Sequence, residues 1–314
     1  MPPFTPTQLI WKDGALVPWH SAQTHVSAHA LQYGTGVFEG MRAYDTGDGP
    51  AIFRLDDHLR RLARSASHYE LTLPYSLEQL RDASLDVVRA NGLTNAYLRP
   101  LAFFDSYSFA VWPQDCPVSV AIIAVPGRVY IDGADRGIRV MISTTRRIDA
   151  SVLPPDVKAC GNYTNSVRAV QEAMRKGFEE AILLNNRGDV AEGSGANLFM
   201  VKDGTLITND VDASILPGIT RDSVLRIARD LGIPVSIRAI SVADVRRADE
   251  LFFSGTAVEV MPIRQVDDHV IGDGTPGTLT RRLRDAYQDA VRGRSHRYHD
   301  WLAPVRPAET IAAR

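Results

Sequence analysis

Hydrophobic residues recur with two different periods along the chain, and these periods separate expected helices from expected strands. Spacings of three and four residues predict helices over 56–69, 76–90, 164–175, 220–231 and 278–291. Short apolar runs predict strands over 96–104, 118–125, 139–143, 181–184 and 251–253, and a β-hairpin over 9–19. Because the two kinds of element mix without strict alternation, we expect an α/β or mixed α+β fold rather than a doubly wound sheet.

Chain length and one polar segment predict two domains. A chain of 314 residues exceeds the usual size of one hydrophobic core. Residues 130–137 are polar and glycine-bearing, which is typical of a connection between domains. We therefore expect a small N-terminal domain, a linker, a larger C-terminal domain and a mobile tail, over residues 1–129, 130–137, 138–304 and 305–314 respectively.

Composition and charge argue against several classes of partner. The net charge of −2 gives no bulk electrostatic reason to expect nucleic acid or an anionic membrane. No apolar run reaches the ~20 residues that a membrane helix needs, and the first ten residues carry no basic-then-apolar signal. Cys116 and Cys160 suit a reducing compartment better than a disulfide framework. We expect a cytoplasmic enzyme or binding protein and no metal site.

Lysine is scarce, so few side chains can supply an amine for chemistry. The 35 basic residues include only four lysines. Lys12 and Lys202 occupy Lys-Asp-Gly turns, and Lys176 ends a predicted helix, where a cation favourably meets the helix dipole. Lys158 has neither role, and arginines at 146–147 could lower its pKa and make it nucleophilic. Taken alone, a solvated lysine is still the commoner explanation.

Three further segments offer groups to a ligand, although each has an ordinary structural explanation. Glu192 precedes a run of small residues, where a flat ligand could approach, but a bulged hairpin with an exposed glutamate would look the same. The helix that starts near Thr220 offers backbone N–H groups to an anion, although simple caps are commoner. Residues 254–257 follow a strand and offer more donors, with a plain turn as the default.

The N-terminal half contains aromatic and basic residues in a pattern that core packing alone does not require. Residues 29–40 mix aromatics with glycines. Tyr97 and Arg99 lie on one face of a predicted strand, which suits a carboxylate, though such a pair can also be structural. Arg61, on the helix 56–69, could equally be a surface residue.

Together, these segments resemble the fold-type IV pyridoxal phosphate enzymes, and most closely the branched-chain amino acid aminotransferases. The resemblance extends from about residue 10 to 305 and is carried, in order, by residues 29–40, 97–99, 158–163, 192–198, 216–221 and 254–257. It implies a two-domain fold like that of D-amino acid aminotransferase, with pyridoxal 5′-phosphate as cofactor.

The resemblance assigns a role to each candidate on the cofactor side. Lys158 would carry the cofactor as a Schiff base and shuttle the proton during amino transfer. Glu192 would pair with the pyridine nitrogen and Tyr163 with the phenolic oxygen. The phosphate would be bound by Arg61, Ile219, Thr220 and Thr256.

On the substrate side, the resemblance implies one pocket with two uses. Tyr97 and the backbone of Thr256 and Ala257 would hold the α-carboxylate. Arg99, with Tyr33 and Tyr130, would bind the distal carboxylate of glutamate. The apolar wall would be formed by Phe38, Tyr163 and Tyr33, the last contributed by a neighbouring subunit of a homodimer or higher homo-oligomer whose active sites lie near the subunit interface.

The implied reaction moves an amino group between leucine, isoleucine or valine and 2-oxoglutarate. Two segments depart from the family pattern: residues 126–129 stand where a tryptophan-glycine pair is frequent, and residues 105–113 replace a glycine-rich loop. These two segments leave the preferred amino donor and acceptor open. The sequence also leaves open the metabolic role and any oligomer larger than a dimer.

Three other functions share parts of this pattern. A D-amino acid or (R)-amine transaminase would need only a remodelled pocket. The segment 97–99 argues against 4-amino-4-deoxychorismate lyase, and a non-catalytic binding protein would lack Lys158 or Glu192.

Overall fold

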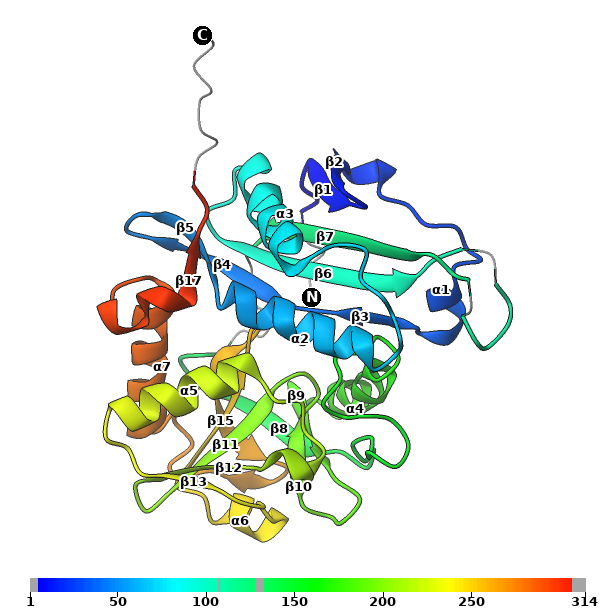
Figure 1. Ribbon diagram of the computed structural model, residues 1–314. Helices are drawn as coiled ribbons and strands as arrows, with labels where there is room; N and C mark the ends of the chain where they lie inside the picture. Colours follow the sequence, from blue (N-terminus) through cyan, green and yellow to red (C-terminus); the bar gives the residue numbers. More distant parts are fainter. Residues whose placement is uncertain (1–4, 107, 114, 128–132, 307–314) are drawn as a thin grey trace. The chain divides into compact units, whose positions relative to one another are not determined.

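Two separate β-sheets organise the chain in the computed structural model, which describes residues 5–106, 108–113, 115–127 and 133–306. The chain divides into two units, each with one sheet and its own helices (Figure 1). The first unit comprises Met1–Arg128, Ala159–Gly161 and Asp289–Arg314, and the second Val129–Lys158 and Asn162–Gln288. The expected α/β mixture of helices and strands is confirmed.

The sheet of the first unit runs in the order β17-β5-β4-β6-β7-β1-β2, with β3 paired to β6. Its longest strands, β6 (Ala96–Phe104) and β7 (Val118–Pro126), pair antiparallel over their full length, as their long apolar runs predict. The remaining strands are β1 (Leu9–Lys12), β2 (Ala15–Pro18), β3 (Gly36–Phe38), β4 (Met41–Thr46), β5 (Gly49–Phe53) and β17 (Leu302–Pro304).

Helices α2 (Leu55–Ser67) and α3 (Leu77–Ala90) cover this sheet through their apolar stripes. Helix α3 lies against β1, β6 and β7, and it begins at a capping box in which Ser76 and Gln79 satisfy each other's backbone N–H groups (Figure 1). Helix α2 packs against α3 and β3. The short elements of this unit are η1 (Trp19–Ser21), α1 (His29–Tyr33) and η3 (His296–Trp301).

The sheet of the second unit runs in the order β10-β9-β8-β15-β14-β11-β12-β13, with β16 paired to β15. Its strands are β8 (Ile138–Ile142), β9 (Glu180–Leu184), β10 (Val190–Gly193), β11 (Asn197–Lys202), β12 (Thr205–Thr208), β13 (Val235–Ile237), β14 (Glu250–Gly255), β15 (Glu259–Val266) and β16 (His269–Val270). A continuous apolar core with fully buried Val140, Ile182 and Val190 lies on one face.

Helices of the second unit pack on that sheet at two places. Helix α4 (Tyr163–Arg175) lies against β9, and α5 (Ile219–Asp230) lies against β13 and β14 (Figure 1). The other helices are η2 (Val211–Ala213), α6 (Val242–Arg246) and α7 (Thr278–Val291), and the last three residues of α7 belong to the first unit. Among the described residues, no helix is both long enough and apolar enough to cross a bilayer.

The end of the chain departs from the expected domain assignment. Strand β17 pairs antiparallel with β5, and residues 289–306 belong to the first unit rather than to a domain over 138–304. The first two residues of the expected mobile tail make hydrogen bonds to the first unit: the Val305 N–H donates to the Pro50 carbonyl at 2.8 Å, and Arg89 Nε donates to the Arg306 carbonyl at 2.6 Å. Residues 307–314 and the first part of the predicted linker, residues 130–132, lie outside the described part of the chain.

Candidate active site

Lys158 is the last residue of a loop in the second unit, immediately before the chain enters the first. Asn162 holds this loop by donating from Nδ2 to the carbonyls of Pro154 (2.9 Å) and Val157 (3.0 Å). On the other side, the Cys160 N–H donates to the Gly36 carbonyl at 2.8 Å within the first unit. Hydrogen bonds to backbone carbonyls therefore hold the chain just before and just after the half-buried Lys158.

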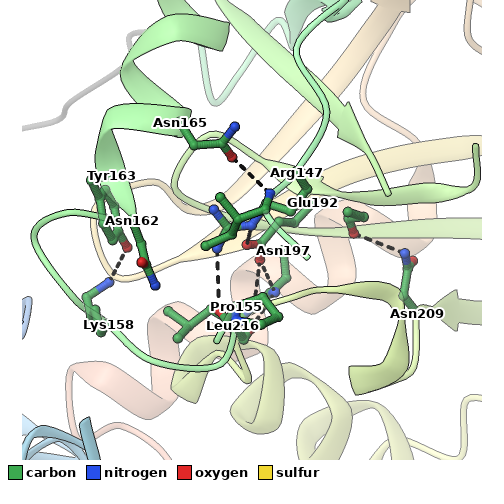
Figure 2. Close-up of polar contacts among 12 residues, drawn as sticks. Arg147, Pro155, Lys158, Asn162, Tyr163, Asn165, Glu192, Asn197, Asn209 and Leu216 are labelled. Carbon is green, nitrogen blue, oxygen red and sulfur yellow. Dashed lines mark hydrogen bonds and ion pairs between the residues drawn. The ribbon is translucent and has the colours of Figure 1, made fainter. Parts of the chain in front are cut away.

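The partner of Lys158 distinguishes it from the other lysines. Its Nζ lies 2.7 Å from Oη of Tyr163, the first residue of α4 (Figure 2). The remaining three lysines instead form ion pairs with the carboxylates of Asp13, Glu172 and Asp249. The Lys158 amine therefore lies beside a phenol, a neutral neighbour that leaves it available to a ligand, whereas the other three amines lie against acids.

Glu192 lies on β10 and is buried, with 5% of the residue surface exposed. The strand register shifts between Val190 and Glu192, so the bulge that sequence reasoning allowed is present, but the exposed glutamate is not. Glu192 Oε1 lies 2.9 Å from Arg147 Nε, and Oε2 accepts from Asn197 Nδ2 (3.0 Å) and from the Leu216 N–H (3.1 Å) (Figure 2).

The charge balance at Glu192 makes this carboxyl responsive to a proton. Burial raises the pKa of Glu192 above its ordinary value, while the charges of Arg147 and Lys158 and the Leu216 N–H oppose that rise. A buried carboxyl of this kind suits a partner that brings its own N–H, such as a protonated ring nitrogen.

The start of α5 forms a potential anion site. Gly218 precedes the helix, and a side chain there would collide with Asn197 Oδ1. Ile219 and Thr220 are buried in the first turn, whose backbone N–H groups lack helical acceptors. Helix α5 packs against β14. Thr256 and Ala257 follow directly after β14, so they belong to the same part of the second unit as α5.

A second feature of this part of the unit is an unsatisfied polar group in β14. The hydroxyl of Ser254 is fully buried and has no hydrogen-bond partner among the residues that the structure describes. An unsatisfied buried hydroxyl costs free energy, so it calls for an acceptor that a ligand could supply.

Arg61 belongs to the first unit and is buried, which contradicts a surface role. Its Nε and Nη2 donate to the two oxygens of Glu39 at 2.6 and 2.9 Å, and His58 Nδ1 lies 2.7 Å from Glu39 Oε2. Glu39 is fully buried, so this guanidinium is held rigidly by a bidentate ion pair.

The predicted substrate residues of the first unit lie close together. Arg99 Nη2 donates to Tyr97 Oη at 2.8 Å, and the guanidinium carbon lies 4.7 Å from the centroid of the Phe38 ring. A side chain at Gly40 would collide with the Tyr97 hydroxyl, which explains the glycine there. Tyr33 is exposed and donates its hydroxyl proton to the Phe109 carbonyl at 2.9 Å, and Tyr130 lies outside the described residues.

Sequence reasoning missed three side chains that hold these candidates in place. Arg147 was expected to act on Lys158, but it is ion-paired with Glu192. Asn197 and Glu39 lie inside segments singled out from the sequence, yet neither was assigned a role. Their position within those segments was the available signal.

Comparison with known proteins places the chain among aminotransferases. Residues 36–266 match the model of the amino-transferase class IV family. The chain is 42% identical over 299 residues to the branched-chain-amino-acid aminotransferase of Salmonella typhimurium, covering 94% of this chain and 97% of that protein.

Solved structures lead to the same family. The branched-chain amino acid aminotransferase of Escherichia coli has 40% identity and a TM-score of 0.93, covering 96% of this chain and 100% of that one. The branched-chain amino acid aminotransferase of Thermobaculum terrenum, solved in its PLP form, has 37% identity and a TM-score of 0.91, covering 96% of this chain and 99% of that one.

Proposed function

This chain belongs to the amino-transferase class IV family and is a transaminase that depends on pyridoxal 5′-phosphate, and from this premise we propose that it transfers amino groups between L-branched-chain amino acids and 2-oxoglutarate. The observation that carries the chemistry is the joint presence of Lys158, Tyr163 and the buried Glu192 in the second unit. The similar proteins named above are branched-chain aminotransferases, which supports the choice of substrates.

The second unit fits this cofactor group by group. Lys158 offers an amine, Tyr163 a phenol for the ring oxygen, and Glu192 a carboxylate for the ring nitrogen. The start of α5, with Ile219 and Thr220, offers donors for the phosphate, as does Thr256 after β14. When bound, pyridoxal phosphate supplies a ring that withdraws electrons from the bonds at the substrate Cα.

Each of these residues then has a definite task. Lys158 binds the cofactor and moves a proton at the substrate Cα, and the Tyr163 hydroxyl at 2.7 Å orients its amine. Glu192 holds the proton on the ring nitrogen, because a buried carboxylate stabilises a cationic partner more strongly than water does. The Arg147 and Asn197 contacts keep that carboxylate from rotating.

Residues of the first unit account for the two kinds of substrate. Phe38 and Tyr97 provide aromatic surface for a branched side chain, and both are buried. Arg99, stacked over Phe38, provides a cation for the distal carboxylate of glutamate or 2-oxoglutarate. Arg61 stays a predicted phosphate ligand, and Tyr130 a predicted substrate contact.

We also propose a homo-oligomer of at least two subunits in the cytoplasm, to which Tyr33 contributes at the subunit interface. Tyr33 is 41% exposed, and Leu31, Phe109, Val111 and Trp112, from the same helix and from the loop that Tyr33 contacts, are exposed as well. Apolar side chains gathered in this way on a surface are typical of protein–protein contacts.

An Arg99→Ala variant tests the substrate assignment. We expect kcat/KM for 2-oxoglutarate to fall by ~100-fold, the scale of a lost charge-assisted pair, while single-turnover reaction with leucine falls much less. Leucine carries no group for a guanidinium, which explains the difference. The Lys158→Ala variant is the inactive control, and a panel of L- and D-amino acid donors gives the range of donors.

Equal losses for leucine and 2-oxoglutarate would make Arg99 a structural residue and refute the two-substrate pocket. Preference of the unmodified protein for D-amino acids would instead overturn the branched-chain assignment.

A further inference from the structure

Arg147 contacts both Glu192 and the loop that ends at Lys158. The proposed function assigns the chemistry to these two residues, the acid and the amine. Arg147 follows β8, and its backbone N–H donates to the Leu184 carbonyl at 2.8 Å, which fixes it at the end of β9. Its side chain is buried, with 7% of the residue surface exposed. A buried arginine is costly unless it is paired, so its partners indicate its purpose.

The Arg147 guanidinium reaches two different segments (Figure 2). Its Nε lies 2.9 Å from Glu192 Oε1, and its Nη2 donates a long hydrogen bond of 3.4 Å to the Pro155 carbonyl. Pro155 belongs to the loop that ends at Lys158. The Arg147 side chain therefore contacts the Glu192 carboxylate and also a backbone carbonyl of the loop that ends at Lys158.

We propose that Arg147 is a positioning residue that orients the Glu192 carboxyl toward the cofactor ring and opposes its protonation. Through Pro155, the same side chain sets the position of the Lys158 loop. This inference rests on the proposed function, because it assumes that Glu192 faces the ring nitrogen.

The charges around Glu192 favour Arg147 over the alternatives. The cations that act on this carboxyl include Arg147, Lys158 and Arg221. The charge of Lys158 cannot stay constant if its amine reacts, whereas a guanidinium is always protonated. Arg221 Nη2 already donates to the Asn209 carbonyl at 2.6 Å.

The remaining contacts of Glu192 are neutral. Oε2 accepts only from the Asn197 amide and the Leu216 N–H among the described residues. Burial raises the pKa of Glu192, and neutral donors alone offset such a rise less than a direct ion pair does. Arginine suits this position better than lysine, because its Nε lies beside Oε1 while its Nη2 donates to the Pro155 carbonyl.

The test is a double-mutant cycle on cofactor affinity. The apo-protein is titrated with pyridoxal 5′-phosphate for the unmodified chain, Arg147→Met, Glu192→Gln and the double variant. We expect Arg147→Met to raise the cofactor Kd by at least about tenfold when Glu192 is present, but by less than about threefold when Glu192→Gln is present, because coupled residues are not additive. The pH at which the bound-cofactor absorbance changes should also shift in Arg147→Met.

Two controls keep the outcome interpretable. Arg146→Met alters the preceding arginine, whose Nη1 donates to the Asn185 carbonyl at 3.5 Å, and it should change the Kd by less than about twofold. Arg147→Lys keeps the positive charge but lacks the forked guanidinium, and its Kd should lie between those of the unmodified chain and Arg147→Met. If Arg147→Met fails to fold, a Kd for Arg147→Lys above that of the unmodified chain tests the inference in its place.

Equal effects of Arg147→Met with and without Glu192, or an unchanged Kd and absorbance, would overturn the inference. A failure of the unmodified chain to bind the cofactor would instead refute the proposed function.

Discussion

Within the described part of the chain, each unit buries one arginine–glutamate pair, and the two pairs are built differently. In the first unit, Arg61 donates hydrogen bonds to both carboxylate oxygens of Glu39, and His58 Nδ1 lies 2.7 Å from Glu39 Oε2. In the second unit, Arg147 meets Glu192 through one nitrogen, and the other oxygen accepts only from neutral donors among the described residues. Both glutamates are almost completely shielded from solvent.

The two geometries give the carboxyls opposite properties. Burial alone would raise the pKa of Glu39, but the charges and hydrogen bonds of Arg61 and His58 outweigh it and hold that pKa far below its usual range. At Glu192 burial prevails, and the pKa is raised despite Arg147. The number of charged donors therefore decides whether a buried acid is a permanent anchor or a group that responds to a proton.

The largest effect should follow from removing the acid of the first pair. Glu39→Ala leaves Arg61 and His58 buried without their carboxylate, and we expect the free energy of unfolding to fall by about 3–5 kcal/mol. Urea unfolding of the apo-protein measures this. Glu78→Ala, on the exposed first turn of α3, is the matched control and should cost under ~1 kcal/mol. A loss at Glu39 no greater than at Glu78 would show that the first pair is not an anchor.

A smaller effect should follow from removing the arginine, and it would separate two roles of Arg61. If Arg61 binds the cofactor phosphate, Arg61→Ala should raise the cofactor Kd by tens-fold, from the loss of about 1.5–3 kcal/mol per charge-assisted hydrogen bond. Arg60→Ala removes the neighbouring arginine of α2, whose partner is Asp57, and should leave the Kd unchanged. Reduced stability with an unaltered Kd would make Arg61 only the anchor of Glu39.

The smallest effect concerns pH, where the two pairs should respond in opposite directions. The lowered pKa of Glu39 means that its stabilisation is present above the unfolded value of ~4.3 and is lost as pH falls through the lower folded value. The raised pKa of Glu192 means that its contribution is present below ~4.3 and is lost as pH rises through the folded value.

Urea unfolding of the apo-protein between about pH 3 and 8 compares the unmodified chain with Glu39→Gln and Glu192→Gln. The free energy of unfolding should change by ~1.4 kcal/mol for each unit by which the folded and unfolded pKa values differ. The advantage over Glu39→Gln should shrink on acidification, and the stability relative to Glu192→Gln should decline on raising the pH. Slopes of the same sign would contradict the distinction between the two pairs.

Sequence patterns predicted the long elements well and the short ones poorly. Strand β6 has the predicted bounds, because nine consecutive mostly buried residues leave little ambiguity. The start of α3 follows from its capping box. Strands β3, β4 and β5 were not predicted, since β3 has only three residues and β4 carries Arg42 and Asp45. Strand β17 pairs with a strand about 250 residues earlier, and no local pattern reports such a pairing.

At the site, the identity of the reactive groups was easier to predict than their support. Lys158 stood out because the other three lysines had evident roles. The burial of Glu192 could not be inferred, because a bulged strand exposes or buries its acid depending on what packs beside it. Arg147 lies 45 positions before its partner Glu192, and that pairing arises only from tertiary structure.

The pairing of β17 with β5 sets the order in which the two units can be completed during synthesis. The second unit is drawn from an internal stretch that ends at Gln288, whereas the first also needs the segment after it. Until residues 302–304 leave the ribosome, β5 is an open edge of its sheet, and open edges invite pairing with other chains. The nascent chain therefore carries an exposed strand edge for about 250 residues of synthesis after β5 has been made.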